Sequence, residues 1–566
     1  MIADILPVLI FFISAILTLF TRGSLRAAIM IVTPFIAAYG IYSLDVGHTL
    51  NATLMGFELE PIRVDKLSML FGYLFCVAAL LGNIYALYHK DTVQHFAAQA
   101  YAGSAIGAVF AGDMLSLFIY WELMALTSAA LIFARRTQKS LYAGIRYLVM
   151  QIISGLLLLA GIVIYYQSVG SLDFNYIGLD SLGGWFFFIA FGIKSAFPLL
   201  HNWLTDAYPE ATASGTVFLS SFTTKVAVYA LARSFAGEEI LIYIGAVMAF
   251  FPIYYAVIEN DLRRVLTYSL INQIGFMVVG IGIGTELALN GAVAHAFADV
   301  IFKGLLMMTM GAVLYTTGGE MRGSELGGLY KKMPKTTMFC IVGAASISAF
   351  PLFSGFVSKS IIVTAVLYEG YYGVWLVLLF AAAGVFHHAG IKIPFFAFFF
   401  RDSKFVETAK EAPKNMLWAM ALSSVLCIMI GVFPQAFYSL LPWPMEYTPY
   451  DTTHILTQLQ LLFFSALAFV WLKLAHIYPP ELKSVNIDAE WVYRKLFPKI
   501  IYNVGNVTAN LYTQFEFKAQ RLLESTGGSI NKFFGARGFL SNFSSLGGMV
   551  MWVAVILAAS LFLYYL

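Results

Sequence analysis

Charged residues are scarce in this chain. Only 11% of its 566 residues are Asp, Glu, Lys or Arg, and 60% are hydrophobic, whereas a soluble domain carries about 25% charged residues. The mean hydropathy is +0.79. This composition excludes an ordinary soluble domain and predicts a membrane protein with many spans. The net charge of +3 is too small to indicate a nucleic-acid partner.

Cysteine is almost absent as well. Cys76, Cys340 and Cys427 all lie in apolar segments, and none has a second cysteine nearby. This pattern excludes a disulfide framework and a cysteine-based metal site. The chain also lacks the glycine pattern of a dinucleotide-binding fold. We therefore expect no metal and no cofactor, and any electron transfer would take place on partner chains.

Long apolar segments occupy most of the chain. A segment of about 20 apolar residues crosses a bilayer as a helix, and on this criterion we expect an all-α polytopic membrane protein with about 16 transmembrane helices. The first segment lacks a basic start and contains Asp4, so we expect it to be retained rather than cleaved. The expected spans are 4–20, 27–44, 66–88, 96–112, 113–134, 141–167, 184–204, 213–234, 238–258, 264–284, 288–316, 336–367, 372–400, 414–440, 457–477 and 547–566. Residues 45–65 should form a polar loop.

Basic residues are concentrated in alternate loops. Arg and Lys follow mainly the odd-numbered spans, as in Arg135-Arg136 and Lys331-Lys332, which predicts that these loops are cytoplasmic. Residues 478–546 mix polar and apolar residues without forming a span. This segment fits an amphipathic helix along the membrane plane or along a partner, and the alternative is a cytoplasmic tail with some helix.

Two near-identical pentapeptides mark internal symmetry. Ser195-Ala196-Phe197-Pro198-Leu199 recurs as Ser348-Ala349-Phe350-Pro351-Leu352, each in the middle of a span. Proline removes a backbone donor and clashes with the preceding turn, so we expect helix breaks at Pro198 and Pro351. Lys194 precedes the first break and Lys359 follows the second. Paired interrupted helices predict a transporter built from repeats, with its path at the bilayer midplane.

Several ionisable residues lie inside the expected spans. Each costs roughly 2.5–3.5 kcal/mol at the bilayer centre on insertion scales, so such groups should face the bundle interior. His295, Asp299 and Lys303 follow one another at spacings of four and line one side of a helix over about 12 Å. The proposed relay groups are Glu122, Lys194, Lys225, His295, Asp299, Lys303 and Lys359.

These acids and bases could pass protons to one another. A carboxylate beside a buried lysine favours the charged lysine, while desolvation favours the neutral form. Moving the carboxylate would therefore switch the proton affinity of the lysine. The alternative interpretation is that the groups are structural ion pairs or side chains that reach the interface.

Other polar residues look structural. Asp113 suits a helix N-cap, and Asp261, Arg263 and Arg264 form a charged loop that we interpret as a topological anchor. His387, His388 and Lys392 precede Pro394 late in a span. They form either an additional proton route or an interfacial cluster, and we favour the cluster.

Several motifs together resemble one family. The run Ala111-Gly112-Asp113-Met114 to Trp121-Glu122-Leu123-Met124 is similar to the glutamate helix of the proton-conducting antiporter-like subunits, which include the A and D subunits of Mrp sodium/proton antiporters and membrane-arm subunits of respiratory complex I. Residues 191–207 resemble that family's broken lysine helix. Lys225 in its threonine context, Asp261 to Ser269 and Ser354 to Lys359 complete the pattern. The resemblance covers roughly residues 60–440.

The resemblance implies two inverted five-helix repeats, each with one broken helix. It implies that Glu122 pairs with Lys194, that Lys225 is the central relay, that His295 and Lys303 connect, and that Lys359 is the terminal site. Asp299 replaces a histidine of many members, as in the D-type Mrp chains. The accessory candidates are His201, His387, His388 and Lys392. The expected segments are N-terminal helices 1–95, repeats 96–234 and 238–400, C-terminal helices 414–477, an in-plane segment 478–546 and a final anchor 547–566.

Three functions fit this resemblance. The first is a proton-translocating subunit of a multisubunit sodium/proton antiporter. The second is a membrane subunit of a redox-driven pump, such as complex I or a membrane hydrogenase, with no redox centre in this chain. The third is a proton-driven subunit of an inorganic carbon uptake complex. Each implies other membrane subunits as partners, protons and for the first Na+ as substrates, and a bacterial cytoplasmic membrane.

Overall fold

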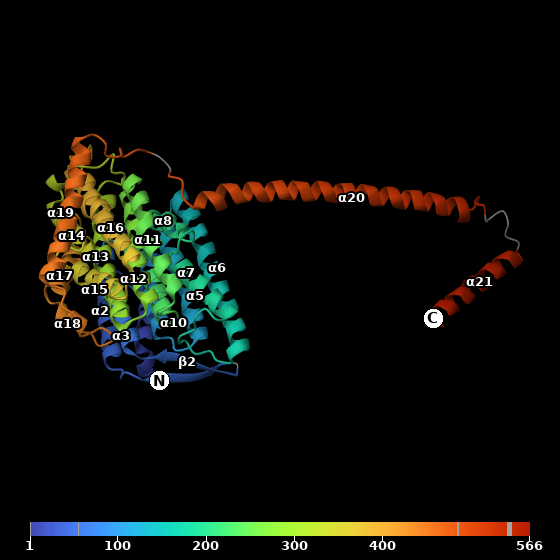
Figure 1. Ribbon diagram of the computed structural model, residues 1–566, viewed down its shortest axis with the longest axis horizontal. Coiled ribbons are helices and arrows are strands. Elements are labelled where there is room, and N and C mark those ends of the chain that lie inside the picture. The colour runs from blue at the N-terminus through green and yellow to red at the C-terminus, as the bar shows by residue number, and fades with distance from the viewer. Residues whose placement is uncertain (1, 55, 484–485, 540–545, 566) are drawn as a thin grey trace. The chain divides into compact units, whose positions relative to one another are not determined.

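The computed structural model describes residues 2–54, 56–483, 486–539 and 546–565. It divides into two compact units, Met1–Asn486 and Ile487–Leu566. Within the described residues, twelve helices are long and apolar enough to cross a membrane, and shorter apolar helices accompany them. Every expected span is occupied by a helix or by a pair of half-helices. The chain is therefore an all-α polytopic membrane protein (Figure 1).

The N-terminal part of the first unit contains a feature that we did not predict. Residues 45–65 are not an irregular loop, because two antiparallel strands form here, with Thr49 opposite Arg63 and Leu54 opposite Phe57. Apolar and polar residues alternate in the second strand, which suits a half-buried strand. Gly56 adopts a positive φ of 85° at the turn. The elements are α1 (Ile2–Phe20), α2 (Gly23–Tyr42), β1 (Thr49–Leu54), β2 (Phe57–Arg63) and α3 (Lys66–Ala86).

The first repeat follows α3, and Asp113 caps its second helix through the amide of Ser116, as expected. Its last span is divided at Phe222 into two helices, although the carbonyl of Phe222 still accepts from the amide of Val226. The elements are α4 (Thr92–Phe110), α5 (Met114–Phe133), α6 (Gln138–Val169), α7 (Leu182–Lys194), α8 (Asn202–Ala207), η1 (Tyr208–Glu210), α9 (Ala213–Ser221) and α10 (Thr223–Ser234).

The second repeat is organised around α13, which packs against α9, α12, α14, α15 and α17. Its last span is not a regular α-helix, because two stretches of it are π-helical. Such wide turns are frequent at functional sites. The elements are α11 (Glu239–Ile258), α12 (Leu262–Ile283), α13 (Glu286–Thr316), η2 (Leu329–Lys331), α14 (Pro334–Ile347), α15 (Ser354–Tyr368), α16 (Tyr372–Val385), η3 (Phe386–Lys392) and η4 (Phe395–Phe399).

Three helices complete the first unit: α17 (Lys414–Val432), α18 (Pro434–Tyr438) and α19 (Thr452–Leu474). The second unit contains η5 (Val492–Leu496), α20 (Phe497–Phe534) and α21 (Leu546–Tyr565). Apolar residues recur along one side of α20 at spacings of three and four, as at Ile501, Val504, Val507, Leu511 and Phe515. This periodicity makes α20 amphipathic. The in-plane orientation of this helix stays a prediction.

Both predicted helix breaks are present and have the same backbone. α7 ends at Lys194 and α8 begins at Asn202, while α14 ends at Ile347 and α15 begins at Ser354. The two half-helix pairs run in opposite directions. α7 begins near Ser234, whose carbonyl accepts from Ile177, on the face that carries the β1–β2 hairpin. α14 begins at the opposite face, where the amide of Lys335 donates to Glu411. This is the inverted arrangement that we expected.

The two faces differ in charge. The hairpin face is tied together by Arg63, which donates to Asn175 at 3.0 Å, and by the amide of Glu60, which donates to Asp113. The opposite face, called here the basic face, carries the loops rich in Arg and Lys. Ion pairs such as Arg136–Asp91 and Lys331–Asp402 connect these loops. The predicted cytoplasmic loops therefore share one face of the first unit.

Candidate functional site

The first predicted relay group, Lys194, is fully buried at the end of α7. Its Nζ donates to the backbone carbonyl of Trp121 at 2.7 Å and lies 4.1 Å from the centroid of the Trp121 ring. The ring is fixed in turn, because its Nε1 donates to Ser154 on α6. A cation over an aromatic face is stabilised by the ring quadrupole. Lys194 is thus attached to α5 at the residue next to Glu122.

Glu122 occupies a space left by a glycine. A Cβ atom added to Gly155 of α6 would lie 1.5 Å from the Oε1 atom of Glu122. The absence of a side chain at this position of α6 is therefore what allows the carboxylate to lie between the two helices. Glu122 and Lys194 are close enough to interact electrostatically. The geometry brings together the carboxylate and the lysine that the family resemblance pairs.

Lys225 forms a buried ion pair at the centre of the bundle. Its Nζ lies 2.6 Å from the Oδ2 atom of Asp299, and both side chains are 0% exposed. It also donates to the carbonyl of Ser220 at 3.1 Å. The irregularity at Phe222 between α9 and α10 places this carbonyl within reach of the lysine. Asp299 thus pairs with a lysine of the other repeat.

The predicted stripe on α13 is present and fully buried. Lys303 donates to the hydroxyl of Ser269 on α12 at 2.9 Å. The ring of His295 contacts two elements: Nδ1 lies 3.0 Å from Ser358 Oγ on α15, and Nε2 lies 3.2 Å from Gln273 Oε1 on α12. The stripe therefore connects α12 and α15 through polar side chains, in the interior of the bundle.

Lys359 lies at the second break. Its Nζ donates at 2.7 Å to the carbonyl of Ile347, the last residue of α14, and lies 5.3 Å from the ring of Phe276. The C-terminal end of a helix carries partial negative charge, which favours a cation. Ser358, the neighbour of Lys359, contacts His295. The predicted terminal group is therefore next to the α13 stripe in the structure.

Four hydrogen-bond partners of the predicted relay groups were not predicted from the sequence. They are the backbone carbonyl of Ser220 and the side chains of Ser269, Gln273 and Ser358. All belong to buried residues of expected spans. The available signal was a polar residue in an apolar segment, as in Asn272-Gln273. Ionisable groups alone were considered as candidates, and neutral donors and acceptors, which also satisfy buried charges, were therefore missed.

The accessory candidates lie in two separate regions of the first unit. The ring of His201 packs against Phe251. His388 and Lys392 are fully buried in η3, and Lys392 donates to the carbonyls of Val257 and Glu259. This group lies at the end of α11, as an interfacial cluster would, yet it is enclosed by protein. Its burial was not anticipated.

A carboxylate from beyond α19 completes that group. Glu481 Oε1 lies 2.9 Å from the Nζ of Lys392, and both side chains are almost entirely enclosed. Burial raises the pKa of Glu481, and the positive charge of Lys392 acts in the opposite direction. His387 contacts the rings of Phe469 and Tyr478 in the same region.

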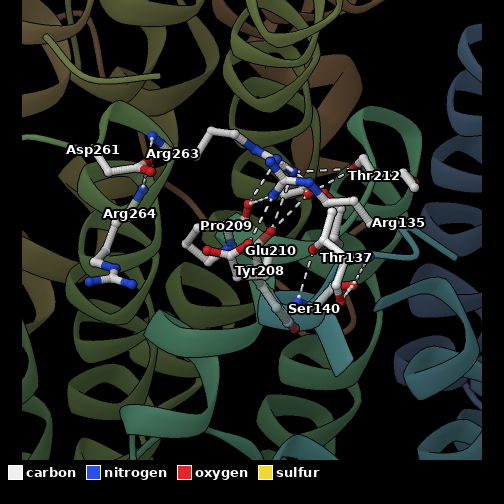
Figure 2. Close-up of polar contacts among 12 residues, drawn as sticks. Arg135, Thr137, Ser140, Tyr208, Pro209, Glu210, Thr212, Asp261, Arg263 and Arg264 are labelled. Carbon is white, nitrogen blue, oxygen red and sulfur yellow. Dashed lines mark hydrogen bonds and ion pairs between the residues drawn. The ribbon is translucent and has the colours of Figure 1, made fainter. Parts of the chain in front are cut away.

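Arg263 was expected in a charged loop that serves as a topological anchor, but it lies inside α12. Its side chain is 1% exposed. The guanidinium donates to the carbonyls of Tyr208, Pro209, Ala211 and Thr212, and to the hydroxyl of Thr216. In Figure 2, Arg135 and Arg263 extend toward this turn from different elements, while Arg264 points away. Arg263 therefore holds the turn that leads from the first broken helix to the Lys225 segment.

Metal ligands are not gathered anywhere in the described part of the chain, where no group of three or more His, Cys, Asp or Glu residues is placed to hold an ion. The predicted relay groups are amines, carboxylates and one imidazole, and hydroxyl groups contact two of them. Such groups exchange protons and form ion pairs.

Inverted broken helices around a line of buried charged groups define an antiporter-like integral membrane protein. Residues 111–387 match the model of the family described as NADH:quinone oxidoreductase/Mrp antiporter, TM. The resemblance seen in the sequence to the proton-conducting antiporter-like subunits is confirmed.

Relatives and solved structures agree with this class. The D subunit of the Na(+)/H(+) antiporter of Bacillus subtilis is 23% identical over 465 residues, which cover 76% of this chain and 93% of the relative. The structure of the Mrp complex from Dietzia sp. DQ12-45-1b matches with a TM-score of 0.76 and 22% identity, over 93% of this chain and 62% of that one. This chain thus spans less than two thirds of the matched chain of that complex.

A second solved structure matches nearly end to end. It is the membrane-bound sulfane sulfur reductase, an archaeal respiratory membrane complex, with a TM-score of 0.71 and 22% identity over 98% of this chain and 99% of that chain. At this identity the match describes the fold. The fold is therefore shared by chains of antiporter and respiratory complexes.

Proposed function

We propose that this chain translocates protons as one subunit of a multisubunit sodium/proton antiporter. The observation that carries the proposal is the enclosed ion pair between Lys225 and Asp299. A pair of this kind gains little stability over apolar packing, because desolvation offsets much of the attraction. Its presence at the meeting of the two repeats favours a role in transport over a role in stability.

The relay runs along three groups of contacts. Glu122 and Lys194 form its first part, in the first repeat. Lys225 and Asp299 form its centre. Lys303 and His295 on α13 form the next part, toward α15. Lys359 is the terminal group.

The ion pair supplies the switch. Near Asp299, the ammonium form of Lys225 is favoured, whereas a lysine separated from its carboxylate in a dry interior favours the neutral form. A small separation of α10 from α13 would therefore release a proton. The carbonyl of Ser220 and the hydroxyl of Ser269 provide nearby hydrogen-bond partners for the lysines during this change.

A redox-driven complex is the second candidate. The end-to-end match to a chain of the sulfane sulfur reductase complex favours it, because α20 and α21 are included in that match. In that case the same relay would move protons in response to electron transfer on partner chains. For both candidates we propose hetero-oligomeric membrane partners and a bacterial cytoplasmic membrane.

The test uses the assembled complex in proteoliposomes with an internal pH-sensitive dye. A sodium gradient without an electron donor should produce a pH change, and Lys225→Ala should abolish it. Lys225→Arg is the sharper variant, because arginine keeps the charge beside Asp299 but does not release a proton. We expect Lys225→Arg to assemble normally and to be inactive.

The matched control is Lys410→Ala, which removes an exposed lysine from the basic face and should retain the wild-type rate. A Lys225→Arg complex that transports at the wild-type rate would refute the relay. A pH change that requires an electron donor and not sodium would transfer the chain to the redox-driven class.

A further inference from the structure

A cavity of about 150 Å³ lies beside Lys359. It is bounded by α15, α16 and the start of α19, and the relay described above does not include it. Most of its wall is apolar, including Phe276, Phe356 and Trp375. Polar side chains are set into this wall along its length: Lys359 and Ser360 from α15, and His454 and Gln458 from α19.

The α19 side of the cavity is fixed by hydrogen bonds to the second repeat. Gln458 donates to the carbonyl of Ser348, inside the second helix break, at 3.0 Å. The Nε2 atom of His454 lies 3.1 Å from the hydroxyl of Thr364. The same hydroxyl lies 3.3 Å from the hydroxyl of Tyr447. The histidine is thus oriented toward the element that carries Lys359.

The other ring nitrogen of His454 lies beside Asp451. Nδ1 lies 2.9 Å from the Oδ2 atom of Asp451, and the two side chains are 31% and 48% exposed. Lys359, at the inner end of the cavity, is only 3% exposed. The segment before α19 lies at the hairpin face, since the carbonyl of Trp443 accepts from Asn290 near the start of α13. His454 therefore contacts both the cavity and the surface.

We propose that His454 is a proton-exchanging residue that connects Lys359, through water in this cavity, with solvent at the hairpin face. This inference rests on the proposed function and adds an exit to it. Lys359 gives a proton to water, His454 takes one up at Nε2, Nδ1 passes one to the carboxylate of Asp451, and this exposed carboxylate returns it to solvent. The charged and titratable groups that face His454 are Asp451, Tyr447 and, across the cavity, Lys359.

Size and chemistry both support this path. One water occupies about 30 Å³ of liquid and needs two to four polar partners, so the cavity has room for several waters, and its polar side chains provide partners. Histidine is also the side chain that changes charge most readily near neutral pH. The alternative is that His454 only fastens α19 to α15, in which case its titration has no consequence for transport.

The first test measures transport in the assembled complex. His454→Gln keeps a hydrogen-bonding side chain beside Thr364 but does not cycle a proton. We expect it to lower the initial rate by roughly 100-fold and to remove the dependence of the rate on pH at the hairpin face. The matched control is His476→Gln, after the opposite end of the same helix, which should leave both rate and pH profile unchanged.

A second variant separates proton exchange from fastening. Asp451→Asn keeps the N-cap of α19, because asparagine caps as well as aspartate, but removes the negative charge beside Nδ1. The initial rate should fall, since the imidazolium loses the carboxylate beside Nδ1. A variant that changes neither the rate nor the profile would overturn the role of this pair.

The third test does not depend on transport. Ser360→Cys places a thiol on the cavity wall, and Ser424→Cys places one on α17, outside the cavity. A membrane-impermeant thiosulfonate reagent applied from the hairpin face should label the first and not the second. The natural cysteines Cys76, Cys340 and Cys427 are buried.

The outcomes distinguish this inference from the function on which it rests. Unlabelled Ser360→Cys, or His454→Gln at the wild-type rate, would overturn the exit even if Lys225→Arg abolishes transport. Transport that is indifferent to Lys225→Arg would instead overturn the relay itself. Labelling, together with a slow and pH-independent His454→Gln, would support the exit.

Discussion

The two broken helices have the same backbone and different chemistry. In the first, Ala196 and Leu199 have φ values of 63° and 69°; in the second, Ala349 and Leu352 have φ values of 56° and 74°. The hydrogen bonds agree as well. The amide of Phe197 reaches the carbonyl five residues before it, and the amide of Phe350 does the same. The repeated pentapeptide therefore determines a repeated turn, a helix C-cap with an alanine in the left-handed region.

The lysines lie on opposite sides of the two turns. Lys194 is the last residue before the first break and donates to a neighbouring helix, at Trp121. Lys359 follows the second break and donates to the other half of its own broken helix, at Ile347. The half-helices after the breaks also differ, since α8 has 6 residues and α15 has 15.

This difference shows that an inverted repeat of the backbone leaves its two lysines in different surroundings. In both halves a carbonyl next to the turn accepts a hydrogen bond from a side chain, at Ile193 from Trp203 and at Ile347 from Lys359. The first half then encloses its lysine between α5 and α6, whereas the second half opens its lysine to a cavity. Symmetry of the backbone thus coexists with asymmetry of access, which vectorial transport requires.

Among the tests of this comparison, the largest effect is expected from a substitution beside Glu122, the carboxylate enclosed in the first repeat. Gly155→Ala adds a methyl group at the position of the Glu122 Oε1 atom, so the carboxylate must move away from Lys194. We expect at least a tenfold loss of proton transport, comparable to a transition-state loss of about 1.4 kcal/mol. The measurement is the initial rate in proteoliposomes.

Gly304→Ala is the control for this substitution. Gly304 lies in α13 beside Lys303, and a Cβ atom there meets no atom within 4 Å. This variant should transport normally. Equal losses at both glycines would mean that added bulk in the bundle, rather than the placement of Glu122, explains the effect.

An intermediate effect is expected at the short half-helix α8. Arg263→Ala leaves the carbonyls of the turn after α8 without their buried donor, and an unsatisfied buried polar group costs about 1–3 kcal/mol. We expect a clear decrease in the thermal unfolding temperature of the complex. Arg264→Ala should change it little, because its ion pair with Glu259, at 3.9 Å, is long and partly exposed.

If the two arginine variants lowered the unfolding temperature equally, net charge on the basic face would explain both results, and the interpretation of Arg263 as a clamp would fail. A wild-type unfolding temperature for Arg263→Ala would show that α8 needs no such support. The short α8 would then be as stable without Arg263 as the longer α15 is without such a clamp.

Much of the fold could be predicted from the sequence, because hydropathy and proline act locally. The spans, both breaks and the burial of the α13 stripe follow from apolar length, from Pro198 and Pro351, and from a spacing of four residues. The hairpin at residues 49–63 was missed, since its short strands lie between two much stronger helical signals.

The partners of the charged groups could not be predicted, because they depend on how helices distant in sequence pack. Asp299 is four residues from Lys303 on the same helix, yet it pairs with Lys225. Arg263 looked like a surface charge and is buried on five oxygen atoms. Glu481, which completes the Lys392 group, comes from the segment 478–546, which we had assigned to an amphipathic in-plane helix.

The smallest effect tests the symmetry itself. Ala196→Gly and Ala349→Gly relieve the left-handed alanines, and each should stabilise the protein by about 0.5–1 kcal/mol, the usual gain when the cost of a left-handed residue exceeds the entropy lost by glycine. Thermal unfolding of the complex would show a small increase of similar size for both. Ala125→Gly, in the regular helix α5, should have the opposite sign. An increase in stability at one break and a decrease at the other would show that the two turns bear different backbone strain. The two repeats would then share the pentapeptide but not its conformational energy.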